Sequence, residues 1–191
     1  MTSRFRVLGA IIAGIIGVLL LEGTVALIIL YSGWYNVAAS RSHLTMVRWF
    51  LSTMMERSVK EHAAGVQAPA QASLREGAAH FAEMCALCHG APDVERSEIG
   101  DGLNPRPPEL FRTAPEWTLE EVYWIGKYGV KMTGMPAFGS THTEDQLWAM
   151  AYFVKQLPEL SPAQYRDLTS ETGLGEQKSG DLQREGAEHQ H

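Results

Sequence analysis

The sequence Cys85-Ala86-Leu87-Cys88-His89 contains both cysteines of this 191-residue chain and places a histidine directly after the second one. This CxxCH pattern is the attachment signature of a c-type haem. Two thiols three positions apart on a helix lie close enough to add to the two vinyl groups of one porphyrin. The histidine is then held beneath the ring, where an imidazole nitrogen can bind the iron. The motif therefore predicts one covalently attached haem c with His89 as an axial ligand.

Three other uses of the Cys85 and Cys88 pair fit the sequence less well. A disulfide between them would close a loop too small to stabilise the chain much. A zinc site would need further Cys or His ligands at matching spacing, and the sequence has none. A thioredoxin-like pair follows a strand, whereas here a helical pattern runs up to the motif. Haem attachment is therefore the interpretation we favour.

An almost wholly apolar segment from Val7 to Tyr31 precedes the motif. It is longer than the about 20 residues that a helix needs to cross a bilayer. Arg4 and Arg6 stand before it, and the excess of positive charge on the cytoplasmic side predicts that the amino terminus stays inside. A cleaved signal peptide is the alternative, because Val37-Ala38-Ala39 resembles a cleavage site, but the usual apolar signal core has only about 7 to 15 residues. We favour a retained anchor.

Both alternatives export the rest of the chain, which agrees with haem attachment on the outer side of the bacterial membrane. We expect a single-pass protein of the bacterial cytoplasmic membrane with its haem domain in the periplasm. Glu22 lies within the apolar segment, where an ionised carboxylate is unfavourable, so it is either protonated or paired. A simple anchor needs no such residue. Glu22 is therefore our candidate contact with an integral membrane partner.

Length and helical periodicity divide the chain into an anchor, a connector, one small domain and a tail. We expect an all-α protein with the anchor at 1–32 and a connector at 33–69 that holds an amphipathic helix after a cap at Ser42. The haem domain is expected at 70–160. The tail at 161–191 has few large apolar residues and is expected to be disordered.

The connector helix has apolar residues at helical spacing with charged residues between them. It could lie on the membrane surface or cover part of a partner. In the first case aromatic side chains would lie near the headgroups, namely those of Trp34, Tyr35, Trp49 and Phe50. His43 and His62 have no second haem-attachment motif beside them, and we interpret them as exposed or membrane-facing. No chemistry is assigned to this segment.

Within the haem domain, helical spacing predicts a first helix from Leu74 to Met84. The Gly- and Pro-rich chain between His89 and Phe111 is unusually long for a loop in a compact domain, and a porphyrin is a suitable object for it to wrap. Two capping boxes predict helices that begin after Thr118 and Thr143. Pro158 is expected to end the second of these helices.

The segment Lys131–Gly139 lies between those two helices and contains Met132 and Met135. A haem iron bound by His89 has a sixth position, and a methionine in an irregular segment is a natural ligand for it. We choose Met135, because Pro136 restricts its backbone and a turn between helices can aim its side chain inward. Met132 is the alternative. A thioether ligand favours reduced iron and raises the reduction potential relative to a second histidine.

Taken together, these motifs resemble a class I cytochrome c domain over residues 70–160. The residues that carry the resemblance are Gly77, Phe81, Cys85, Cys88, His89, Gly90, Gly102-Leu103, Pro105, Pro107, Pro108, Leu110 and Gly134-Met135-Pro136. The closest resemblance is to membrane-anchored monohaem domains found as small subunits or fusions of bacterial terminal oxidases and dehydrogenases. It implies helices that wrap one haem, with the first and last crossing near Gly77 and Tyr152.

The resemblance also implies which residues surround the haem. A backbone carbonyl within Asn104–Pro108 is expected to accept a hydrogen bond from the second ring nitrogen of His89. Arg106 and Trp124 are candidates to contact the haem propionates. The candidate haem-contacting residues are thus Asn104, Pro105, Arg106, Pro107, Pro108 and Trp124.

Charge narrows the choice of partners. Residues 70–160 include seven basic and thirteen acidic side chains, which argues against a lysine-rich docking ring. A basic partner surface, or apolar contact around the haem edge, suits this domain better. The chain has no basic patch with interleaved aromatic residues, so we do not expect nucleic-acid binding.

We therefore expect a tethered electron carrier and not an enzyme. It would relay single electrons between a donor and an acceptor protein. These are expected to be respiratory or dehydrogenase partners that include an integral membrane complex, and the tether would keep the carrier near them. The alternative is a haem enzyme or gas sensor in which Met135 leaves and peroxide or nitric oxide binds. Enzyme function needs acid or base groups over an open site. His142 is the nearest candidate in sequence, but we interpret it as a solvated loop residue.

Overall fold

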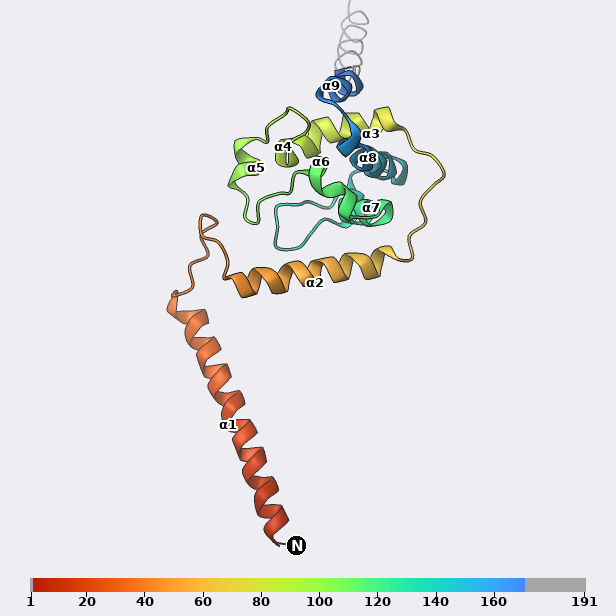
Figure 1. The fold of residues 1–191 in the computed structure, drawn as a ribbon. Coiled ribbons are helices and arrows are strands. Elements are labelled where there is room, and N and C mark those ends of the chain that lie inside the picture. Colours follow the sequence, from red (N-terminus) through yellow and green to blue (C-terminus); the bar gives the residue numbers. More distant parts are fainter. Residues whose placement is uncertain (1, 171–191) are drawn as a thin grey trace, which may run out of the picture. The chain divides into compact units, whose positions relative to one another are not determined.

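The computed structural model describes residues 2–170, whose regular secondary structure is helical and includes no strand (Figure 1). The expected all-α class is confirmed. The chain divides into two compact units, Met1–Arg41 and Ser42–His191. Each unit is described by itself below.

The first unit contains a single long helix, α1 (Thr2–Ser32). It includes the whole apolar segment seen in the sequence. Its apolar side chains are exposed along its length, as those of Ile11 and Leu20 illustrate. Thr24 donates a hydrogen bond to the Leu20 carbonyl at 2.7 Å, which satisfies its hydroxyl within the helix. A helix of this length and composition is consistent with single-pass membrane anchoring.

The second unit is a cluster of short helices with the following bounds. The longer helices are α2 (Thr45–Ala63), α3 (Leu74–His80), α7 (Leu119–Tyr128), α8 (Glu144–Gln156) and α9 (Pro162–Ser170). Shorter ones are α4 (Ala86–His89), α5 (Glu98–Gly102) and α6 (Leu110–Thr113). A π-helical turn, η1 (Phe81–Cys85), and three 3₁₀ turns, η2 (Ala114–Glu116), η3 (Phe138–Ser140) and η4 (Leu157–Glu159), complete the described chain.

The helix that leads to the CxxCH motif continues through it. α3, η1 and α4 follow one another without a break, so helical backbone runs from Leu74 to His89. The wider π turn lies directly before the motif, a type of irregularity that is frequent at functional sites. Gly90 ends the run with a φ of 67°, a conformation that favours glycine. A Cβ at this position would lie 2.9 Å from the Val94 carbonyl oxygen.

Both capping boxes are present. Thr118 Oγ1 accepts from the Glu121 amide at 3.2 Å, and the Glu121 carboxylate accepts from the Thr118 amide at 2.7 Å. Thr143 and Gln146 make the same reciprocal pair at the start of α8. Pro158 lies in the 3₁₀ turn that follows α8, as expected for a residue that stops a helix. The Ser42 cap is wrong, because α2 begins at Thr45 after Leu44 and has no side-chain cap.

The core forms where α3 crosses α8. Gly77 faces the α8 backbone, and a Cβ there would lie 2.0 Å from the Ala149 carbonyl oxygen. The crossing therefore lies at Ala149 and Phe153, on either side of the expected Tyr152. The rings of Phe81 and Phe153 pack 5.3 Å apart beside it. Tyr152 instead donates a hydrogen bond to the Pro69 carbonyl at 2.7 Å, which holds the chain that enters α3.

Gly77→Ala is expected to lower the free energy of unfolding by about 2–3 kcal/mol, because the added methyl overlaps backbone that cannot move aside. Chemical denaturation of the full chain in detergent, followed by circular dichroism, measures the change. Gly65→Ala is the matched control, because a Cβ at that exposed position meets nothing within 4 Å. Equal stabilities of the two variants would contradict the close crossing.

α9 corrects the expected tail. The prediction of disorder from Ser161 is wrong for residues 162–170, which are helical, and the remainder of that tail lies outside the described residues. Tyr165 is buried, and its ring lies 6.4 Å from Phe81, edge to face. Ser161 and Gln164 form a capping pair at the start of this helix. The same pattern correctly predicted α8 and could have predicted α9.

α2 packs on α7 of the same unit. Val59 and Ala63 are buried, and the His62 ring lies 5.6 Å from that of Trp124 on α7. After α2, the chain at Val66 packs against the cluster that contains Tyr123 and Trp148. Much of the expected connector therefore belongs to the same unit as the domain that follows it. The sequence pattern predicts an apolar face on this helix but does not indicate which surface that face covers.

Candidate haem-binding site

The two cysteines of the motif are both free and partly buried. Cys85 ends η1 and Cys88 lies in α4. The two cysteines are three residues apart in one helical run, so their side chains lie on the same side of it. The disulfide considered from the sequence is not formed. Burial, and to a lesser extent the neighbouring Cys88 thiol, raises the pKa of Cys85 to about 12. At neutral pH this thiol is therefore protonated.

His89 is buried and its ring is fixed by the chain. Its Nδ1 lies 2.8 Å from the Pro108 carbonyl oxygen, within the stretch that the resemblance indicated. Because a carbonyl only accepts, Nδ1 carries the proton in this contact and Nε2 has a free lone pair. The pKa of His89 is lowered by burial first and by the nearby Arg96 charge, against the opposing effect of the Pro108 bond. A neutral imidazole with Nε2 available is the form that binds a metal.

The loop after the motif is held against it by short contacts. Ser97 donates from both its amide and its hydroxyl to the Leu87 carbonyl, each at 2.9 Å. Gly100 approaches so closely that a Cβ would lie 2.9 Å from the Cys88 Cα. The loop is therefore packed directly onto the helix that carries the motif.

Arg96 is a site residue that the sequence reasoning missed. Its side chain is buried, and its guanidinium donates to the Pro107 carbonyl at 2.6 Å and to the Glu109 carboxylate at 3.2 Å. These contacts lie on either side of Pro108, so Arg96 positions the carbonyl that orients His89. Its hydrogen-bond partners, the Pro107 carbonyl and the Glu109 carboxylate, lie more than ten residues away, so no local sequence signal identifies it.

Arg96→Gln is expected to destabilise the full chain by about 2–3 kcal/mol, because it leaves buried hydrogen-bonding groups without a charged partner. Arg112→Gln is the matched control. Arg112 pairs with the same Glu109 at 3.0 Å but is exposed, so its loss should change stability by less than about 0.5 kcal/mol. Thermal unfolding measures the stability of both variants. Equal losses of stability in the two would contradict the proposed role of the buried Arg96.

The loop from Gly129 to Ala137 carries both candidate methionines, and its contacts fix the backbone around Met135. Gly129 has a φ of 65°, and a Cβ there would lie 2.7 Å from the Pro136 carbonyl carbon, so the two ends of the loop touch. The Val130 amide donates to the Met135 carbonyl at 3.3 Å. Thr133 accepts from the Met135 amide at 3.1 Å and donates to the Val130 carbonyl at 2.8 Å. These bonds fix the backbone of Met135.

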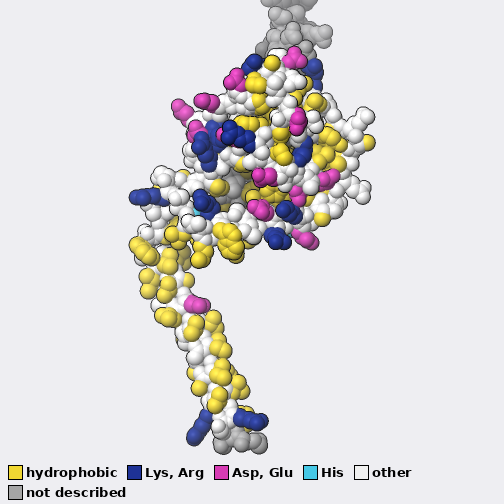
Figure 2. Space-filling model, viewed as in Figure 1, with side chains coloured by type: hydrophobic (Ala, Val, Ile, Leu, Met, Phe, Trp, Pro, Cys, Tyr) yellow, Lys and Arg dark blue, Asp and Glu magenta, His cyan; other side chains and the backbone are white. Residues whose placement is uncertain are grey.

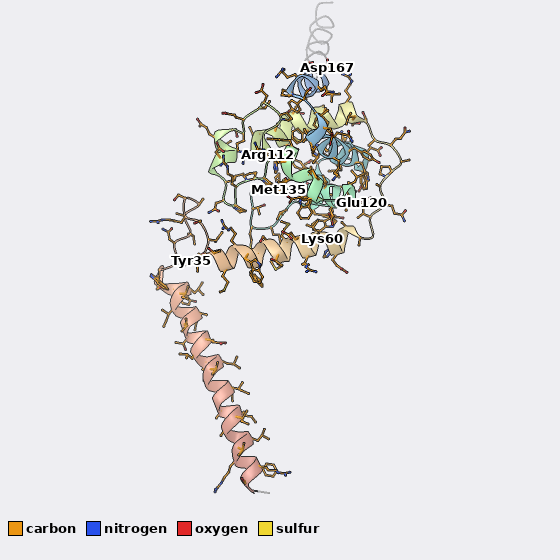
Figure 3. The ribbon with its side chains drawn as sticks, in the orientation of Figure 1. Tyr35, Lys60, Arg112, Glu120, Met135 and Asp167 are labelled. Atoms are coloured by element: carbon orange, nitrogen blue, oxygen red, sulfur yellow. The ribbon has the colours of Figure 1, made fainter. Side chains whose placement is uncertain are left out.

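The two candidate methionines differ in exposure. Met135 is half-buried and lies among the loops of the second unit, near α7 in the view of Figure 3. Met132 has a φ of 61° and 79% of its surface exposed. An exposed side chain cannot reach into the interior, so this difference favours Met135 over Met132 as the inward-facing residue.

The other expected haem contacts are arranged less uniformly. Pro107 and Pro108 act through their carbonyls, as described above. Arg106 is exposed and pairs with Asp101 at 2.6 Å, so in this structure it faces the surface. Trp124 lies between the rings of His62 and Tyr128 on the α7 surface. Asn104 is partly buried and Pro105 is exposed.

Three further histidines, His62, His80 and His142, make contacts within the second unit. The His142 ring lies 5.2 Å from that of His80, edge to face, and its Nδ1 is 2.8 Å from the Thr141 hydroxyl. His62 Nδ1 lies 2.7 Å from the Ser58 carbonyl oxygen. Among residues 2–170, no three His, Cys, Asp or Glu side chains are grouped so that they could hold a metal ion.

A long helix that ends in two free cysteines and a neutral, oriented histidine fits a covalently bound haem, and this fold and site define a c-type cytochrome domain. Residues 72–154 match the family model described as cytochrome c oxidase, cbb3-type, subunit III. This part of the chain is thus a monohaem class I c-type cytochrome domain that carries haem c and transfers electrons. No curated protein and no solved structure matches the chain.

Proposed function

We propose that the chain is a membrane-tethered relay that passes single electrons between partner proteins on the outer side of the bacterial cytoplasmic membrane. In this proposal residues 70–160 hold the haem, with Cys85 and Cys88 as its covalent attachments. His89 Nε2 and the Met135 sulfur would bind its iron. The bound haem supplies a site that gains and loses one electron without substrate chemistry.

The observation that carries the proposal is the hydrogen bond from His89 Nδ1 to the Pro108 carbonyl. It leaves Nε2 as the coordinating atom. Arg96 holds the Pro108 carbonyl in place through its hydrogen bonds to the residues before and after it, Pro107 and Glu109. On the opposite ligand, Thr133 restrains the backbone of the half-buried Met135. Two ligands held before the electron arrives need little rearrangement when the charge of the iron changes, which suits an electron carrier.

The membrane part of the proposal rests on α1. Residues 1–32 form the anchor, and Arg4 and Arg6 keep the amino terminus on the cytoplasmic side. Glu22 lies in the same helix and is proposed to contact an integral membrane partner, because a carboxylate at that depth requires a proton or a polar neighbour. The tether keeps the haem domain at high local concentration near such a partner.

Carbon monoxide tests the axial assignment. We expect the absorption spectrum of the reduced protein at neutral pH to be unchanged by the gas, because Met135 fills the position that it would need. The same protein in a denaturing urea concentration is the control, since the covalent haem remains while Met135 is released and the gas then binds. Rapid complex formation by the folded protein would instead support the gas-sensing or enzymatic alternative.

A further inference from the structure

The first half of α2 presents an apolar surface that its own domain leaves uncovered. We call it the α2 apolar surface, and its residues are Leu44, Met46, Val47, Trp49, Phe50 and Met54. The exposed fractions are 77% for Met46, 65% for Trp49 and 58% for Phe50. Figure 2 shows hydrophobic side chains gathered along this part of the helix. A contiguous patch of exposed apolar side chains marks a site of contact with a protein or a membrane.

The orientation of α2 within the second unit is fixed by its other face. Val59 and Ala63 are buried against the domain, and His62 packs on Trp124 of α7. Residues 46, 50 and 54 follow one another at intervals of four on the side away from Val59. The α2 apolar surface therefore points outward for as long as the helix stays docked.

The outward side changes character along the helix. After Met54 the same side continues with Arg57 and Glu61, and the adjoining Lys60 is charged as well. Only the first half of α2 can therefore enter an apolar medium. This half is also the one nearest to α1 along the chain.

The occupant we infer is a lipid bilayer, and the inference rests on the proposed function because it uses α1 as a membrane anchor. Twelve residues separate Ser32 from Thr45. Fully extended, they reach at most about 40 Å. The beginning of α2 is therefore always held near the membrane into which α1 inserts, whereas a soluble protein has no such enforced proximity.

The chemistry of this region suits the lipid interface. Tryptophan is enriched where membrane meets water, and both Trp34 in the linker and Trp49 on the helix are exposed. Arg48 is exposed in the same stretch, on the Val59 side of the helix, and adds positive charge of the kind that attracts lipid phosphates. Aromatic, aliphatic and basic side chains in one short stretch are the composition of helices that lie in the interface plane.

We propose that the α2 apolar surface lies in the headgroup region of the membrane that holds α1. The haem domain would then be attached at two places, by the tether and by α2. It could not rotate freely about its linker. Only the faces of the domain that point away from the α2 apolar surface would be open to soluble redox partners.

Spin labels test this in the full haem-loaded chain, reconstituted in vesicles of phosphatidylcholine and phosphatidylglycerol. The variants Phe50→Cys and Met54→Cys each introduce a single cysteine. The nitroxide label is attached to it after haem attachment has consumed the thiols of Cys85 and Cys88. Arg57→Cys and Glu61→Cys, on the same side of the helix, are the controls. Accessibility is measured to oxygen, which concentrates in lipid, and to a water-soluble nickel chelate. We expect the oxygen-to-nickel ratio at 50 and 54 to exceed that at 57 and 61 several-fold.

Two results would overturn the inference. Labels at 50 and 54 as accessible to nickel as those at 57 and 61 would show that the surface is in water. Labels shielded from both reagents would show contact between copies of the chain. Alkaline washing of the same vesicles separates this inference from the proposed anchor. If the chains stay in the pellet while the label at position 50 is accessible to nickel, only the α2 contact is refuted. If the chains wash off, the anchor is refuted as well.

Discussion

A variant with serine at both Cys85 and Cys88 is expected to carry no haem after denaturation. These are the only cysteines of the chain, so no other thiol can form the bond. The serine hydroxyl does not replace the thiol in thioether formation, and a haem that is held only by axial ligands is lost when the fold opens. Haem staining of a denaturing gel measures the result directly, with the signal expected to fall to background.

Leu87→Ser is the matched control for the double variant. Leu87 lies between the two cysteines in the same helix and is 48% exposed, so a serine there adds a hydroxyl to the motif without removing a thiol or a core side chain. Its gel is expected to stain like that of the unaltered protein. Haem that remained attached in the double variant would show that the chain binds it covalently somewhere else, and the proposed attachment would be wrong.

The features that could be predicted from the sequence are those that depend on a few neighbouring residues. The capping pair at Thr118 depends only on a residue three positions away, and it forms as expected. The same is true of Thr143. The helical run that leads into CxxCH also depends on neighbouring residues, and it is present in the structure. Local chemistry therefore decides where most of these helices start.

The features that were missed depend on contacts between distant parts of the chain. α9 has a correct capping pair, but its single buried aromatic residue, Tyr165, has meaning only beside Phe81. The docking of α2 needs the surface of α7, which no pattern within α2 describes. Arg96 looks like an ordinary loop arginine until the loop folds back and brings the Pro107 carbonyl to it. Such residues gain their role from tertiary structure.

The candidate site shows the same division. The cysteines and His89 could be predicted because attachment chemistry requires a fixed spacing. The choice between Met132 and Met135 could be argued from Pro136, and the exposure of Met132 now supports that choice. The direction of Arg106 could not be predicted, because its pairing with Asp101 depends on how the loop turns.

Replacement of the proposed axial methionine is expected to have the largest effect on the redox chemistry. Met135→His exchanges a soft thioether, which favours reduced iron, for an imidazole that favours oxidised iron. We expect the reduction potential to fall by on the order of 0.2 V, within the roughly 0.8 V range that axial ligands cover. A spectroscopic redox titration of the purified full chain measures the shift. Met135→Ala should instead leave the sixth position open, so that the reduced protein binds carbon monoxide.

Met132→Leu distinguishes the two candidates. Met132 is exposed, and its removal should change neither the potential nor the response to carbon monoxide. If Met132→Leu lowers the potential and Met135→His does not, the axial ligand is Met132, and the loop must rearrange so that this side chain turns inward. If neither variant has an effect, the iron has a different sixth ligand. Since Thr133 restrains Met135 through a backbone hydrogen bond, the loop as it is folded here agrees only with a potential that falls in Met135→His and stays unchanged in Met132→Leu.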